Sequence, residues 1–65
     1  MEDQALIEQA IDKAFEAQVK GIYQALSQNI VIAAGDEAKL ADAKEKFTLA
    51  IAHAKQVKAA AQSSL

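Results

Sequence analysis

The chain has 65 residues, a net charge of -2 and 52% apolar residues, with no Cys, no Pro and no Arg. Sixteen of the apolar residues are Ala, so few side chains can fill a core. A chain this short usually needs a disulfide, a metal or another chain to complete its fold. The lack of Cys excludes disulfides, and with His53 as the only His a structural zinc site has too few ligands. Association with another chain remains.

Charge and hydropathy exclude several classes of partner. A chain with seven Lys against nine acids lacks the basic face that neutralises phosphates, so we expect no nucleic-acid partner. The longest apolar run, residues 30–34, is far shorter than the ~20 residues of a membrane span, so we expect no membrane insertion. The acidic start of the chain is unlike a signal peptide, and the absence of Cys fits a reducing compartment. Together they predict a cytoplasmic location.

The first predicted element is a helix over residues 3–34, with Asp3 as a candidate N-cap. Apolar residues recur there at steps of three and four, the pattern of one helix face. They are Ile7, Ile11, Ala14, Phe15, Val19, Ile22, Ala25, Leu26, Ile30 and Ala33. Gly21 either weakens this helix or allows another backbone to approach closely. Gln18 and Asn29 also fall on the stripe. They either reach solvent from its edge, which we favour, or form a buried polar pair that selects register or partner.

The second predicted element is a helix over residues 37–62. Gly35 suits the left-handed position that ends the first helix, and Asp36 suits the N-cap of the second. Apolar residues then follow a heptad pattern: Leu40, Ala43, Phe47, Ala50, Ala54, Val57 and Ala61. Four of these seven are Ala, which predicts that the neighbouring helix lies unusually close. The short connection makes the two helices antiparallel.

The predicted fold class is therefore all-α, a single domain over residues 1–65 that forms an antiparallel two-helix hairpin. Its core is expected to consist of Ile7, Ile11, Phe15, Ile22, Leu26, Leu40, Phe47, Ile51 and Val57. Because each helix covers only one side of the other, we expect oligomerisation or a protein partner to complete the core. Apolar residues outside the main stripes are the candidate partner-binding residues. They are Leu6, Tyr23, Val31 and Leu49.

Side chains for catalysis are scarce. His53 lies on the helix face away from the predicted core, and no Ser has a His neighbour in sequence. The acidic row of Glu8, Asp12 and Glu16 lacks the Glu-x-x-His motif of di-metal bundles, and no phosphate loop is present. We therefore expect no enzymatic activity, no catalytic, cofactor or metal site, and no small-molecule substrate. The row suits a basic partner surface or the Lys55 and Lys58 end of the second helix.

The layout resembles the small cytoplasmic co-chaperones of type III secretion needle subunits. The matching features are the turn Ala34-Gly35-Asp36 and the Leu-Ala-Ile-Ala run at residues 49–52. The resemblance implies a hairpin that docks a larger helical-repeat chaperone and helps to keep a filament subunit monomeric.

Two alternatives share the same architecture. One is a self-associating four-helix-bundle homodimer of structural, phage or filament type. The other is an RNA-binding hairpin that resembles the plasmid copy-control family. We disfavour it because the basic residues are few and scattered. The interpretation we favour is a non-enzymatic protein–protein interaction module, whose partner is another protein or a second copy.

Overall fold

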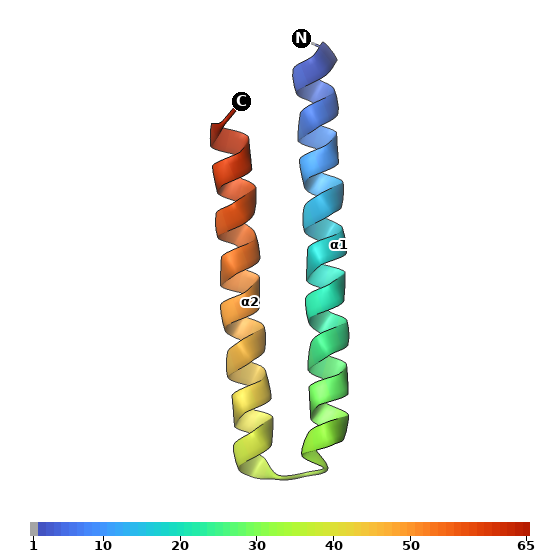
Figure 1. The fold of residues 1–65 in the computed structure, drawn as a ribbon, viewed down its shortest axis with the longest axis vertical. Helices are drawn as coiled ribbons and strands as arrows, with labels where there is room; N and C mark the ends of the chain where they lie inside the picture. Colours follow the sequence, from blue (N-terminus) through green and yellow to red (C-terminus); the bar gives the residue numbers. More distant parts are fainter. Residues whose placement is uncertain (1) are drawn as a thin grey trace.

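The structure, a computed structural model that describes residues 2–65, consists of two helices joined by a short turn (Figure 1). Helix α1 spans Glu2–Ala33 and helix α2 spans Glu37–Ser63. The helices run antiparallel, so both termini lie at one end and the turn at the other. The predicted all-α hairpin is confirmed, and the predicted helix limits differ from the observed ones by at most one residue.

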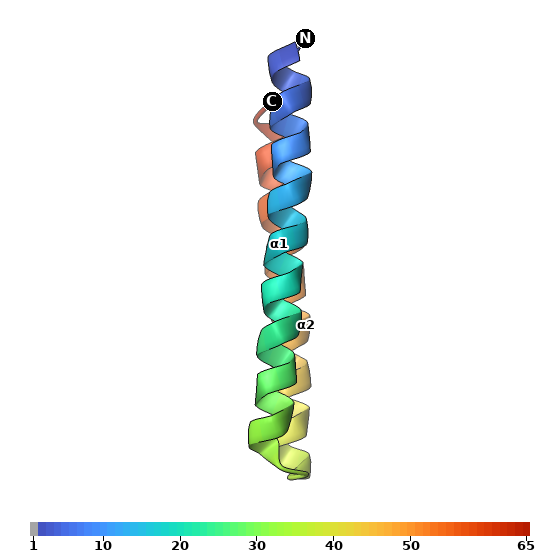
Figure 2. The same ribbon diagram turned by 90° about the vertical axis from the view of Figure 1, so that its right-hand side faces the viewer.

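The hairpin is a single layer of helices. Its Cα atoms extend over 52 × 16 × 7 Å, and in the edge-on view α1 largely covers α2 (Figure 2). The smallest extent is close to the width of one helix backbone, since helical Cα atoms lie on a cylinder of about 2.3 Å radius. Domains are normally built from at least two packed layers. Here both broad sides of the layer are open to solvent.

The turn is formed by two residues with left-handed backbones followed by a cap. Ala34 has φ 49° and Gly35 has φ 83°, and the Asp36 amide donates to the Ala33 carbonyl at 2.9 Å. The Asp36 side chain then accepts a hydrogen bond from the Lys39 amide at 3.1 Å and caps α2. The predictions that Gly35 takes the left-handed position after the first helix and that Asp36 caps the second helix are both confirmed. At the other end, α1 already begins at Glu2, so the prediction that Asp3 is its N-cap is wrong.

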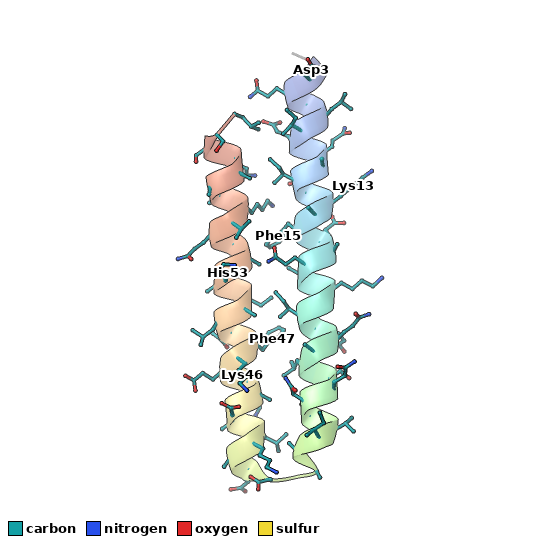
Figure 3. All side chains as sticks on the ribbon, viewed as in Figure 1. Asp3, Lys13, Phe15, Lys46, Phe47 and His53 are labelled. Atoms are coloured by element: carbon teal, nitrogen blue, oxygen red, sulfur yellow. The ribbon has the colours of Figure 1, made fainter. Side chains whose placement is uncertain are left out.

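Small residues set the contact between the helices. Among residues 3–65 the buried residues are all Ala: Ala33, Ala43 and Ala54, the last with no exposed surface. Seven of the nine predicted core residues are half-buried around them, and Figure 3 shows Phe15 and Phe47 between the helices. Those seven are Ile11, Phe15, Ile22, Leu26, Leu40, Phe47 and Ile51. Among the described residues no large side chain is fully buried, so the hairpin has a contact seam rather than a closed core.

Ile7 and Val57 are the two predicted core residues that the structure contradicts. Ile7 is 47% exposed because the first turns of α1 project beyond the end of α2 (Figure 1). Val57 is 46% exposed because its position in the heptad has rotated to the edge of the contact. The half-buried residue beside it is Lys58.

Gly21 gives a direct test of helix energetics. It is exposed inside α1, and a Cβ added there would have no neighbouring atom within 4 Å. No close backbone approach occurs at Gly21 within the hairpin. We expect Gly21→Ala to raise the free energy of unfolding by about 1 kcal/mol, because Ala is the better helix former.

Urea unfolding at fixed protein concentration measures this effect. Gly35→Ala is the matched control, because its positive φ makes the same exchange costly and should reverse the sign. A Gly21→Ala variant that is less stable than the original chain would contradict the prediction.

Candidate protein-binding surface

Lys58 links the two helices on one broad side of the hairpin. Its Nζ lies 3.5 Å from Asp12 Oδ1 and 4.7 Å from the centroid of the Phe15 ring. The Lys58 side chain is 31% exposed, so its methylene stem covers part of the apolar seam while the ammonium group stays near water. The prediction that the acidic row suits the Lys58 end of the second helix is thus confirmed for Asp12.

Sequence reasoning missed Lys58 as a seam residue. The available signal was its spacing, four residues after Ala54 and seven after Ile51, which places it on the inner side of α2.

The contribution of Lys58 can be measured by substitution. We expect Lys58→Ala to lower the free energy of unfolding by about 1–2 kcal/mol, because it removes a cation–π contact, an ion pair and stem packing together. Lys58→Met keeps most of the methylene stem, so its free energy of unfolding should fall by about half as much as that of Lys58→Ala. Thermal unfolding followed by circular dichroism is the measurement.

Lys46→Ala is the control for Lys58. Lys46 pairs with Asp42 at 3.0 Å, but both side chains are mostly exposed, so its loss should cost less than about 0.5 kcal/mol. Equal losses for the two Lys→Ala variants would contradict a bridging role for Lys58.

The side of the hairpin that carries Lys58 also carries bulky apolar residues. On α1, Val19 and Leu26 follow Asp12 at intervals of seven, so they lie on the same side, and Tyr23 and Ile30 lie four residues after each. On α2, Ile51 precedes Lys58 by seven. We call this surface the tyrosine face: Val19, Tyr23, Leu26, Ile30 and Ile51. Part of it is hollowed, and the hollow is lined by Tyr23, Leu26, Ser27, Ile30 and Val31.

The opposite broad side is more polar near the turn. A hollow there is lined by Asn29, Ile32, Ala33, Lys39, Asp42, Ala43 and Lys46. Asn29 is exposed, which agrees with the edge interpretation, whereas Gln18 is half-buried and lines a hollow with Phe15 and Ala54. Near the turn this side therefore presents charged and amide groups, and farther from the turn its hollows are lined mainly by apolar residues, among them Ile11, Ile22 and Val57.

The four predicted partner-binding residues do not form one surface. Leu6, Tyr23, Val31 and Leu49 are all exposed, by 62% to 76%. Tyr23 and Val31 line the same hollow. Leu6 lies about 25 Å away along α1, at 1.5 Å per residue, and Leu49 lies on the other helix. Contact with a partner stays a prediction for each of them. Tyr23 belongs to the tyrosine face, and Val31 lies at the edge of its hollow.

The described side chains were also compared with the needs of a metal site and of a membrane-spanning helix. Among the side chains of residues 3–65, no group of three or more His, Asp or Glu is placed to hold a metal ion, and His53 is exposed on α2. Within the same residues, neither helix has an apolar stretch of the length that a membrane crossing requires. Comparison of the chain with protein-family models, curated proteins and solved structures finds no match. The candidate site thus rests on the geometry of the hairpin.

Proposed function

We propose that this chain is a non-enzymatic protein–protein interaction module, one half of a helical core that another chain completes. One observation carries the proposal. The hairpin exposes 5088 Å², whereas a compact monomer of 6.9 kDa exposes about 4,000 Å². Its radius of gyration is 15.3 Å, against about 11 Å for a compact chain of this length.

The character of the exposed surface supports the same function. Single exposed apolar residues are common, but here every large apolar side chain of the described chain is at least partly exposed. Covering these side chains stabilises a complex by about 25 cal/mol per Å² of apolar surface. Binding and completion of the fold are therefore one event, which is typical of modules that associate through helix faces. A cytoplasmic location, which suits a chain without Cys, is part of the proposal.

The test is the behaviour of the isolated monomer. At sub-micromolar concentration, circular dichroism should show low helicity and no cooperative thermal transition. A monomer that is fully helical and unfolds cooperatively under those conditions would overturn the proposal, because the hairpin would then need no other chain.

A second candidate is a co-chaperone of a secreted filament subunit. Its support is the layout of a long first helix, a Gly35-Asp36 turn and an Ala-rich second helix. The test is co-purification with such a subunit and its helical-repeat chaperone. Replacing Tyr23 and Leu49 by Ser should abolish co-purification, whereas replacing the exposed Gln24 and Gln56 by Ser should preserve it.

A further inference from the structure

We propose that a second copy of this chain docks on the tyrosine face, giving a four-helix bundle whose twofold axis runs parallel to the helices. The inference rests on the proposed function. It adds which chain binds and on which side of the hairpin it binds. A second copy is a layer of the same length and width, so it covers both helices of the hairpin at once. The result is the two-layer arrangement that this single layer lacks.

The area to be covered agrees with a homodimer. The hairpin exposes about 1,100 Å² more than a compact chain of its mass. If each copy covers that excess on the other, the interface totals about 2,200 Å², within the range of obligate homodimers, which starts near 2,000 Å². A single added helix would cover only the groove between α1 and α2 on one side.

Charge complementarity points to the second copy in particular. On the tyrosine face, α1 presents the acid Asp12 followed by Val19 and Leu26. At the same three positions along the long axis of the hairpin, α2 presents Lys58, then Ile51, then Lys44. Asp12 and Lys58 are at one level because they already pair at 3.5 Å.

A twofold axis parallel to the helices places α1 of each copy over α2 of the other. This rotation does not shift any residue along the helix direction. Asp12 of the second copy then lies over Lys58, Val19 over Ile51, and Leu26 over the stem of Lys44. The surface is therefore complementary to itself, as an isologous interface requires.

Other arrangements bring unfavourable groups together. A second copy rotated end for end would place its α2 on α2 of the first copy, with Lys44 of one copy near Lys58 of the other. Like charges that face each other weaken association. Docking on the opposite broad side would cover Asn29 and Lys39 beside the turn, and burying such groups without partners is costly. Docking on the tyrosine face in the parallel orientation avoids the contact between Lys44 and Lys58 and leaves Asn29 and Lys39 exposed to water.

Sedimentation equilibrium of the full chain from 1 to 200 μM tests whether a second copy binds and whether it binds on the tyrosine face. We expect a dimer that dissociates on dilution. Ile30→Gln should raise the dissociation constant at least tenfold, because a twofold interface contains the substitution twice. Ile32→Gln is the matched control. The same exchange two residues away, beside Lys39 and Asp42, should change it less than twofold.

The outcomes separate this inference from the proposed function. A chain that stays monomeric up to 200 μM would overturn the proposal that a second copy of the chain is the partner. If that monomer is weakly helical, the proposed function stands with a different partner, and if it unfolds cooperatively, both fail. An effect of Ile32→Gln as large as that of Ile30→Gln overturns the choice of face.

The orientation has its own readout, because a chain without Cys accepts a single spin label cleanly. Ala38→Cys places the label at an exposed site beside the turn. Parallel docking should give a label separation below about 25 Å, whereas the end-for-end arrangement separates the turns by about 40 Å along the axis. The longer distance would overturn the proposed axis.

Discussion

Replacement of Phe47 by Ala is expected to lower the free energy of unfolding by about 3 kcal/mol and to remove the cooperative thermal transition at micromolar concentration. Phe47 projects between the helices (Figure 3) and lines the space there with Ile22, Leu26 and Ala43. Removing the ring loses its burial and leaves a cavity that two rigid helices cannot close. A chain of this size has only a few kcal/mol of stability to lose.

The control for Phe47 lies two residues away on the same helix. Leu49 is 62% exposed, so Leu49→Ala should change the free energy of unfolding by less than about 0.5 kcal/mol. Phe47→Leu, which keeps an apolar side chain in the seam, should cost less than about 1.5 kcal/mol. Thermal unfolding followed by circular dichroism, at one protein concentration for all variants, gives the comparison. Equal losses for Phe47→Ala and Leu49→Ala would contradict the position of the seam.

The helices and the turn could be predicted because their signals are local. The steps of three and four in the apolar pattern require no knowledge of the partner helix. Gly35 and Asp36 are each favoured by the backbone geometry of their own position, a positive φ and a cap. The N-cap prediction failed at Asp3 because the residue at which a helix starts is uncertain by one or two positions, and Asp3 lies one residue inside α1.

The seam was predicted less completely because it depends on how two helices meet. A heptad repeat on a straight helix drifts by about 20° per heptad relative to its neighbour. After two heptads this drift carries Val57 to the edge of the contact and brings Lys58 inward. The exposure of Ile7 depends on the different lengths of α1 and α2, which only the assembled hairpin reveals.

The candidate site was the hardest part to predict. The four residues chosen from the sequence are exposed, as expected, but exposure alone does not say which of them share a side. The Asp12–Lys58 pair and the hollow beside Tyr23 lie on the same broad side, and the pair depends on the rotation of α1 against α2. Once that rotation is known, Ile51 and Lys58 of α2 can be assigned to the side of Tyr23, whereas Leu49 cannot.

Replacement of Ala54 by Leu is expected to force the helices apart. Ala54 has no exposed surface and lies where α2 approaches Phe15 and Gln18 of α1. A larger side chain at a packed position costs about 1–3 kcal/mol, because neighbouring side chains and backbones must move. Ala52→Leu is the matched control: Ala52 is exposed on the same helix, and Leu is nearly as good a helix former, so stability should change by less than about 0.5 kcal/mol.

The Ala54 substitution also bears on association. Moving α2 away from α1 separates Lys58 from Asp12 and changes the spacing of the two lines of side chains on the tyrosine face. Ala54→Leu should therefore weaken the dimer as well as the hairpin, whereas Ala52→Leu should leave both unchanged. Urea unfolding and sedimentation equilibrium on the same samples measure the two effects. An Ala54→Leu chain as stable as the Ala52→Leu chain would show that the close approach of the helices at Ala54 is not what holds the hairpin together.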